Sequence, residues 1–311
     1  MWWAATMVAA AAAVGQASAS GGAAAECDDS ELRQHPAPQQ QPDCQAPTTG
    51  VTDTLLCRTG PQATYTRVPW LGQWAWSEQG QKTHLAMRSE IKGGQVSRVH
   101  NALSPVVAEA LFNELAHASV NWTRQLNTDA SDSVRFSRHV LHCTLDGAEQ
   151  HAGGWSLGDG TVENTCPLLL LHFHRYLNDN SRWWSQFTEP AVHSWSSFTE
   201  GPQATWYREN DYLSRHNDRS GHHNKRALAF TLSLAKHFQP RFGGSFRWEA
   251  NSSDVTQYNP EFNTLLLFVP ASSSWHAVSA VTNDLRTRAE GEAEGIGTRR
   301  RMAISGWFLS S

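Results

Sequence analysis

The sequence lacks several features that would point to common classes of partner. It has no basic block, and its formal net charge is −4, with 25 Lys and Arg interspersed among 29 Asp and Glu over 311 residues. A nucleic acid is therefore not the expected partner, because phosphate binding depends on clustered cations. None of the cysteines forms a Cys-x-x-Cys motif, which argues against a structural zinc site. The apolar runs are too short for a comfortable bilayer crossing, so no stable membrane span is expected.

The N-terminal segment resembles a secretory signal peptide, although no Lys or Arg precedes its apolar run. The Ala-rich run ends near Val14, and Ala17 and Ala19 have the spacing of a signal-peptidase site. We expect residues 1–19 to be a signal peptide that directs the chain to the secretory pathway, either the endoplasmic reticulum lumen or the extracellular space. An uncleaved signal anchor and an organellar leader stay open as alternatives.

The compartment decides the expected state of the five cysteines. In an oxidising lumen we expect two disulfides and one free thiol, with Cys143–Cys166 as one candidate pair. In a reducing compartment all five would be thiols. The sequence alone leaves the pairing open.

Composition divides the rest of the chain into a linker and one folded domain. Residues 20–69 are rich in Ala, Gln, Pro and Thr without an apolar period, which predicts a low-complexity linker. Order is expected from about Trp70, so the domain would occupy residues 70–311. Ser104 and Pro105 have the pattern of an N-cap and first helical residue, and residues 168–177 form a second apolar stretch of helical length. Residues 129–164 are Gly-rich and polar, and we expect loops over a cleft there.

From residue 203 onward the chain reads as short β-strands. Residues 227–234 alternate between small and large apolar side chains, which suits a sheet with a cavity on one face and a packed core on the other. Further strands are expected at 262–269, 275–281 and 299–309. About six or seven short strands without intervening helices predict a mainly β fold with flanking helices. Its core, residues 203–309, would be a double-stranded β-helix of the jelly-roll or cupin-like kind.

An H-x-D motif at the end of one expected strand is the strongest chemical feature. Residues i and i+2 of a strand project from the same face, so His216 and Asp218 would point to the same place. Together with a second histidine they would form the 2-His-1-carboxylate triad that binds Fe(II) and leaves positions open for other ligands. The motif alone is weak, because a solvated His and Asp in a loop explain it equally. His276, about sixty residues later on another expected strand, supplies the second histidine.

The last expected strand offers a binding site for a carboxylate. Period-2 alternation places Arg301, Ala303, Ser305 and Trp307 on one face. Arginine binds a carboxylate through two parallel hydrogen bonds and stays charged when buried. Arg301 with the Ser305 hydroxyl would therefore suit the distal carboxylate of 2-oxoglutarate. A solvated basic strand end, which we expect for Arg300, is the alternative for Arg301.

Several segments of the last third of the chain resemble the prolyl 4-hydroxylase-like branch of the Fe(II)/2-oxoglutarate-dependent dioxygenases. The resemblance extends from about residue 206 to 308. Its motifs occur in the family's order: a Tyr before DYL-x-x-HND, RALAFTLSL at 226–234, the Gly243-Gly244 pair, FNTLLLFVP at 262–270, WHAVSAV at 275–281 and RMAISGWF at 301–308.

This resemblance implies specific roles for six residues. In such enzymes the H-x-D and the distal His bind iron, which corresponds here to His216, Asp218 and His276. The Arg that opens the last strand binds 2-oxoglutarate, assisted by a hydroxyl residue and an upstream Tyr, which correspond to Arg301, Ser305 and Tyr207. No catalytic side chain beyond the metal centre is expected.

The implied activity is that of an oxidoreductase that hydroxylates a C–H bond with O2 and releases succinate and CO2. The resemblance favours a prolyl residue of a protein or peptide as substrate, with L-ascorbate keeping the iron reduced. Asp218 favours hydroxylation over halogenation, since the related halogenases lack this carboxylate. A hydroxylase of a free amino acid or small metabolite, and an inactive jelly-roll binding module, are the alternatives. A zinc cupin hydrolase would need a further histidine.

The sequence departs from the family in two places. Some relatives have a Tyr where Ser233 lies, and that Tyr helps to hold the co-substrate. The segment 282–298 is a charged insertion between His276 and Arg301, and we expect a surface loop or lid there.

Overall fold

The computed structural model describes a set of segments that all lie within one compact unit, residues 40–311. These segments are 44–45, 54–58, 65–117, 120–129, 134–141, 167–188, 203–219, 225–236, 238–251, 254–282 and 301–310. The expected signal peptide, the expected loop 282–298 beyond Thr282 and the candidate pair Cys143–Cys166 lie outside the described residues.

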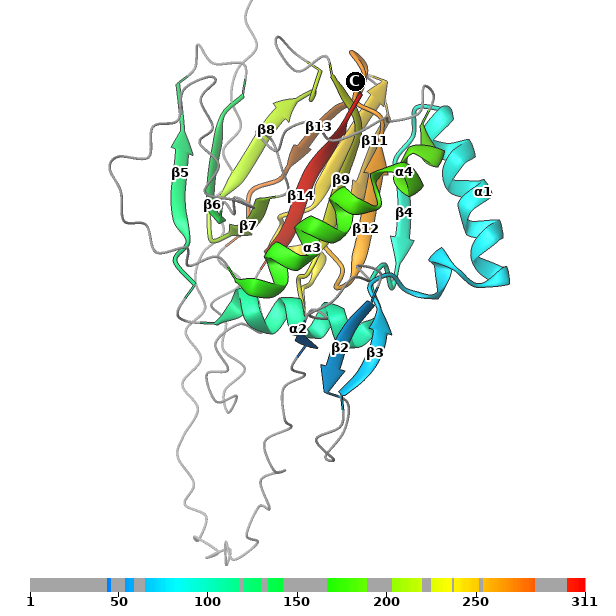
Figure 1. Cartoon of the computed structure of the whole chain (residues 1–311). Helices are drawn as coiled ribbons and strands as arrows, with labels where there is room; N and C mark the ends of the chain where they lie inside the picture. The colour runs from blue at the N-terminus through cyan, green and yellow to red at the C-terminus, as the bar shows by residue number, and fades with distance from the viewer. Residues whose placement is uncertain are drawn as a thin grey trace, which may run out of the picture. The chain divides into compact units, whose positions relative to one another are not determined.

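Strands outnumber helices in the described region, and the helices flank them (Figure 1). The strands are β1 (Cys44–Gln45), β2 (Thr54–Arg58), β3 (Tyr65–Pro69), β4 (Ser97–His100), β5 (Thr123–Asn127), β6 (Phe136–Leu141), β7 (Gln203–Tyr207), β8 (Tyr212–His216), β9 (Arg226–Ser233), β10 (Phe246–Asn251), β11 (Asp254–Tyr258), β12 (Thr264–Phe268), β13 (Trp275–Val278) and β14 (Arg301–Leu309). The helices are η1 (Gln73–Ala75), α1 (Glu78–Lys92), α2 (Pro105–Ala116), α3 (Leu168–Asp179), α4 (Ser181–Trp184), η2 (Ser185–Phe187) and η4 (Pro240–Phe242).

The main sheet is antiparallel and curls upon itself. Its order is β11-β10-β13-β8-β6-β7-β14-β9-β12-β4, with β5 paired to β6. Strands β8 and β13, which carry the H-x-D and the second histidine, thus lie in the same sheet as β14, which carries Arg301. The expected mainly β fold with a double-stranded β-helix core is confirmed.

Alternation along the central strands separates the hydrophobic core from the inner face. On β9 and β14, Leu232 pairs with Ile304, and both are almost completely buried. They belong to a core that includes Phe173 and Leu177 of α3, which crosses in front of β14 and β9 (Figure 1). The residues that alternate with them, such as Thr231 and Ser305, line a cavity instead. The small-residue face expected from the sequence is therefore the inner face.

Helix α1 was not foreseen from the sequence. Its buried positions include only Gly80, Met87 and Ile91, too few to give a clear apolar period. Its start is fixed by Ser77, whose hydroxyl accepts a hydrogen bond of 3.0 Å from the Gly80 N–H. At α2 the expected cap differs, because the Ser104 hydroxyl donates instead to the Pro69 carbonyl at 2.6 Å and makes no cap bond within its helix.

Three short strands lie in the segment for which composition suggested a linker. Strands β1, β2 and β3 form a small antiparallel sheet, and Cys44 pairs with Cys57 across β1 and β2 in a disulfide. Leu55 and Cys57 are buried in the main core. Strand β2 has only five residues and lies between low-complexity segments, so composition did not predict it. One disulfide and one buried face hold it in place.

The expectation of loops throughout 129–164 is wrong for residues 136–141. These residues form β6, which pairs with β5, β7 and β8 inside the main sheet. Its sequence, FSRHVL, has three consecutive polar residues, which are also common in loops and in water-exposed strands, so the sequence did not indicate a strand of the main sheet. Its cross-strand partners, which the sequence does not show, are what place Phe136 and Arg138 at the cavity.

Asn263 joins β12 to the loop before α2, and its loss is expected to destabilise the fold. It has a left-handed φ of 55°. Its side chain accepts from the Leu103 N–H at 2.8 Å and donates to the Leu103 carbonyl at 2.9 Å. Asn263→Ala leaves both buried backbone groups unpaired, so we expect a loss of about 2–4 kcal/mol in the free energy of unfolding.

Chemical denaturation of Asn263→Ala and Asn210→Ala tests this expectation. Asn210 also has a positive φ, 67°, but its side chain is exposed. The Asn210 variant therefore reports the backbone cost alone, about 1 kcal/mol. Equal losses in the two variants would show that the hydrogen bonds of Asn263 add nothing to stability.

Among the helices of the described region, none combines the length and apolar character needed to cross a bilayer.

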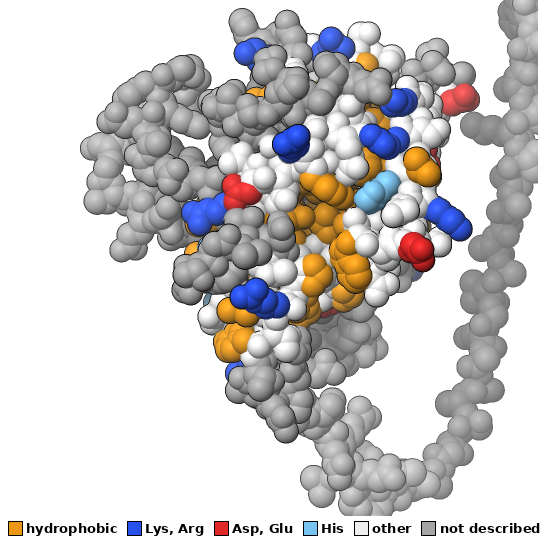
Figure 2. Space-filling view, turned by 45° about the vertical axis from the view of Figure 1, so that its right-hand side comes forward, with side chains coloured by type: hydrophobic (Ala, Val, Ile, Leu, Met, Phe, Trp, Pro, Cys, Tyr) orange, Lys and Arg blue, Asp and Glu red, His pale blue; other side chains and the backbone are white. Residues whose placement is uncertain are grey.

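On the face shown in Figure 2, apolar side chains gather near the centre, and Lys and Arg side chains lie around them.

Candidate metal and co-substrate site

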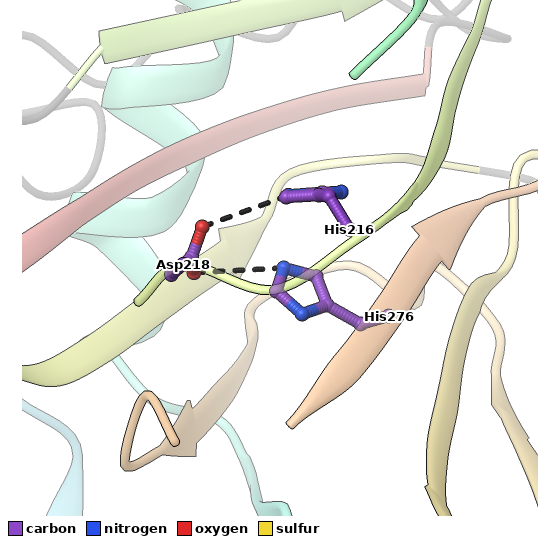
Figure 3. A group of neighbouring side chains, drawn as sticks. All are labelled: His216, Asp218 and His276. Carbon is purple, nitrogen blue, oxygen red and sulfur yellow. Dashed lines mark ion pairs between the residues drawn. The ribbon is translucent and has the colours of Figure 1, made fainter. Parts of the chain in front are cut away.

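Strands β8 and β13 bring the two histidines together. His276 pairs directly with His216 in the antiparallel register, and their ring centroids are 4.2 Å apart. Asp218 follows β8 by two residues and points back between the two rings (Figure 3). One ligand atom from each of the three residues lies within 4.8 Å of the others. Among the described residues, these are the three that the sequence analysis expected to bind iron.

The orientation of both imidazoles is fixed by the backbone. Nδ1 of His216 lies 2.8 Å from the Ser214 carbonyl, and Nδ1 of His276 lies 2.9 Å from the Ser274 carbonyl. A carbonyl can only accept, so each Nδ1 carries a proton and each Nε2 is the nitrogen that faces Asp218. The two Nε2 atoms lie 3.6 and 3.5 Å from the Asp218 carboxylate oxygens. Such hydrogen bonds on the far nitrogen are what orient histidine ligands in metal sites.

The electrostatics of the cluster favour an ionised Asp218 and a neutral His276. Burial by itself would raise the pKa of Asp218, but the hydrogen bond with His216 and the nearby histidine charges outweigh it, so the pKa lies well below its usual value. Burial, reinforced by His216, lowers the pKa of His276 to about 4, although Asp218 opposes the shift. A carboxylate and a neutral imidazole are the protonation states that a divalent cation requires.

Aromatic rings hold His276 in place. The Phe246 and Trp248 rings stack against its imidazole at centroid distances of 5.3 and 6.1 Å, and Phe268 meets it edge-on at 4.9 Å. These three aromatic residues belong to a separate small hydrophobic core, which also contains Val96, Ala229 and Leu266. The histidine is therefore packed on a rigid apolar support rather than on a loop.

Arg226 contacts the same carboxylate and was not singled out from the sequence. Its Nη1 lies 3.4 Å from Asp218 Oδ1 and 3.3 Å from the Asp218 carbonyl oxygen. Its guanidinium stacks over the Trp307 ring, with Cζ 3.7 Å from the centroid. Arg226 thus contacts Oδ1, the same carboxylate oxygen that lies 3.6 Å from His216 Nε2. The only sequence feature that could have suggested it is the position of Arg226 at the start of the strand that follows the H-x-D.

Arg301 is a buried cation without a described carboxylate partner. Its side chain is almost fully buried, and its Nε donates to the Gly244 carbonyl at 3.1 Å. Its Cζ lies 4.4 Å above the centroid of the Tyr207 ring. Burial lowers the pKa of Arg301, and Tyr207 opposes this shift. An arginine nevertheless stays charged at neutral pH, and a buried charge requires a counter-charge.

The Gly243-Gly244 pair makes room for this arginine. Both residues have positive φ angles, 69° and 62°. A Cβ on Gly243 would lie 2.0 Å from the Ala280 carbonyl oxygen, and one on Gly244 would lie 3.2 Å from Cγ of Arg301. Larger residues would strain the backbone and displace the carbonyl that orients the guanidinium.

Tyr207 and Ser305 lie where the sequence analysis expected them to face the co-substrate. Tyr207 pairs with Arg301 across β7 and β14, and Ser305 lies on the same side of β14. The Ser305 and Thr231 hydroxyls are 3.2 Å apart, so Thr231 adds a hydroxyl that the sequence analysis had not assigned to the site. Ser233, at the position of the family's Tyr, has a buried hydroxyl without a hydrogen-bond partner among the described residues and does not line the cavity.

One cavity of about 600 Å³ joins all of these groups. Its lining includes the expected residues Tyr207, His216, Asp218, His276, Arg301 and Ser305, together with the unforeseen Phe136, Arg138, Arg226 and Thr231. The arrangement provides three metal ligands and, separately, a cationic site for a carboxylate in the same cavity.

Part of this chain matches a family model, and its fold is similar to solved structures. Residues 202–309 match the family model described as the 2OG-Fe(II) oxygenase superfamily. A prolyl hydroxylase from Trichoplax adhaerens, solved in complex with a hypoxia inducible factor peptide fragment, is similar in fold with a TM-score of 0.51 at 13% identity, covering 75% of this chain and 93% of that one. A Pseudomonas putida prolyl-4-hydroxylase matches with a TM-score of 0.47 at 14% identity, covering 73% and 99%. The curated proteins contain no sequence match to this chain.

Proposed function

We propose that this chain is a member of the 2OG-Fe(II) oxygenase superfamily, whose model residues 202–309 match, and that it hydroxylates a prolyl residue of a protein or peptide. The observation that carries the proposal is that the His216, Asp218 and His276 cluster and the buried Arg301 face the same cavity. A metal centre and a carboxylate site within one cavity are what an Fe(II)- and 2-oxoglutarate-dependent oxygenase requires.

The three clustered side chains fit a divalent cation. The Nε2 atoms of both imidazoles and the Asp218 carboxylate converge, with one ligand atom from each residue within 4.8 Å of the others, so a cation could contact all three. Two imidazoles and one carboxylate are the ligand set of non-haem Fe(II) oxygenases. Bound Fe(II) would supply the O2 activation that couples 2-oxoglutarate decarboxylation, to succinate and CO2, with hydroxylation. His216, Asp218 and His276 would hold it.

The residues around Arg301 fit the distal carboxylate of 2-oxoglutarate. The guanidinium has neutral contacts with Gly244 and Tyr207 but no described carboxylate. A dianionic acid would provide the missing counter-charge, and the Ser305 hydroxyl on the same face could donate to it. The protein's part in the reaction is thus to orient the co-substrate and to exclude water from it.

The prolyl substrate rests on the sequence resemblance and on the peptide-bound relative of similar fold. We further propose ascorbate as the reductant that keeps the iron active, and the secretory pathway as the location. A hydroxylase of a free amino acid or small metabolite would use the same site. An inactive binding module is disfavoured, because every group of the metal and carboxylate sites is present.

Succinate release tests the proposal. The wild-type protein is incubated with 2-oxoglutarate, Fe(II), ascorbate and O2, with and without a library of Pro-containing peptides. We expect Fe(II)-dependent succinate that increases with some peptides, and the mass of one added oxygen on their prolyl residues.

Three other results would each change the conclusion. Stimulation by free amino acids alone would favour the small-molecule alternative. Stimulation by peptides with oxygen added at residues other than Pro would replace the prolyl substrate. Absence of succinate, together with absence of Fe(II)-dependent 2-oxoglutarate binding by calorimetry, would leave only a binding module.

A further inference from the structure

The described lining of the cavity carries more positive charge than its proposed ligands neutralise. It contains three arginines, Arg138, Arg226 and Arg301, and one carboxylate, Asp218. Bound Fe(II) and dianionic 2-oxoglutarate would cancel each other's charge, and Asp218 would offset one arginine. Two guanidinium charges are then left in a partly apolar space, where electrostatic interactions are stronger than in water.

Arg138 is the arginine with room for a further partner. Its Nε and Nη2 each lie 3.3 Å from the neutral Gln125 side-chain oxygen, and its Cζ lies 4.9 Å from the centroid of the Phe136 ring. Within the described part of the chain, no carboxylate lies at ion-pair distance from it. It is also only half-buried, unlike Arg301. The amide and the ring therefore fix a guanidinium whose charge is not neutralised.

The register of the sheet places Arg138 on the cavity face. On β6 and β7, His139 pairs with Trp206, so the preceding Arg138 and the following Tyr207 lie on the opposite face. Both line the cavity, and Tyr207 pairs in turn with Arg301. Arg138 on β6 therefore lies in the same cross-strand row as Tyr207 on β7 and Arg301 on β14. Strand β7 separates it from Arg301.

We propose that Arg138 binds an acidic side chain, Asp or Glu, next to the hydroxylated residue of a peptide substrate. The proposal rests on the proposed function and specifies the substrate further. A guanidinium recognises a carboxylate through paired hydrogen bonds, and Gln125 pre-orients it for this purpose. A basic residue at the same position of the substrate would be repelled, so the arginine selects against it as well.

Peptides that differ by one side chain test this proposal. Peptides with blocked ends carry Glu, Gln or Lys immediately before or after a single Pro, so that the Glu side chain is the only carboxylate. Hydroxyproline formation gives kcat/KM for each, and fluorescence anisotropy gives peptide affinity without O2, in the presence of Fe(II) and 2-oxoglutarate. At one of the two positions we expect the Glu peptide to exceed the Gln peptide about tenfold in both quantities, and the Lys peptide to be the poorest.

Variants of Arg138 identify the residue responsible. In Arg138→Gln the Glu-to-Gln ratio should fall to about one, and in Arg138→Glu the Lys peptide should become the best. Arg124→Gln is the matched control: Arg124 is exposed on the adjacent strand β5 and does not line the cavity, so this variant should keep the wild-type ratio.

Four outcomes would overturn the proposal. One is an unchanged ratio in Arg138→Gln. Another is a raised KM for 2-oxoglutarate in that variant, which would assign Arg138 to the co-substrate. The third is hydroxylation of free proline but of no blocked peptide. The fourth, equal hydroxylation of all peptides, would refute this inference alone, whereas absence of succinate and hydroxyproline under every condition would refute the proposed function.

Discussion

Asp218→Ala is expected to lower Fe(II)- and 2-oxoglutarate-dependent succinate formation by more than about 100-fold. Changes to residues that merely orient metal ligands cost about 10- to 100-fold in metal affinity or activity, and Asp218 is itself the only anionic ligand of the set. Without it, a cation would face two neutral imidazoles and the nearby Arg226 guanidinium. The loss should therefore appear first in metal binding.

Metal titration under anaerobic conditions separates this effect from unfolding. Asp218→Ala should bind Fe(II) at least about 100-fold more weakly than wild type while keeping its circular dichroism spectrum. Glu249→Gln is the matched control, since Glu249 lies on β10 opposite Trp275, pairs with Arg215 and does not line the cavity. Wild-type iron affinity in Asp218→Ala would refute the role of this carboxylate as a ligand.

The site residues that could be predicted from the sequence are those whose side-chain direction is set by the alternation of their own strand. Alternation along β14 must direct Arg301 and Ser305 together. The structure brings these residues into one cavity with the two histidines, Asp218 and Tyr207. Local geometry was sufficient for β14, whereas Asp218 lies in the turn after β8, where strand alternation does not fix its direction.

The residues that were missed owe their position to cross-strand pairing. Arg138 faces the cavity only because β6 pairs with β7 and β8, and its polar sequence suggested a loop instead. Arg226 reaches Asp218 because it stacks on Trp307 of a strand far along the chain. Pairings between distant strands leave little trace in a single sequence, so these contacts needed the structure.

Arg301→Gln is expected to raise the KM for 2-oxoglutarate by about thirtyfold or more. Truncating one partner of a buried, hydrogen-bonded charge pair costs about 2–5 kcal/mol, and each 1.4 kcal/mol corresponds to about tenfold in affinity. Glutamine can still donate to the Gly244 carbonyl, but it has neither the charge nor the fork of Arg301. Arg301→Lys restores the charge alone and should give an intermediate KM.

The stability of the same variant distinguishes a ligand-binding arginine from a structural one. Arg301 is buried against neutral groups among the described residues, so the Gly244 carbonyl and the Tyr207 ring offset only part of its desolvation in the ligand-free protein. We therefore expect ligand-free Arg301→Gln to melt at or above the wild-type temperature, and 2-oxoglutarate with Fe(II) to raise the melting temperature of wild type more than that of the variant. A less stable ligand-free variant with an unchanged KM would instead make Arg301 a structural residue. We expect both results, a ligand-free variant at least as stable as wild type and a smaller stabilisation by ligand, because the Arg301 charge is unpaired until an anion binds. The free energy that its burial costs in the ligand-free protein is recovered only on binding.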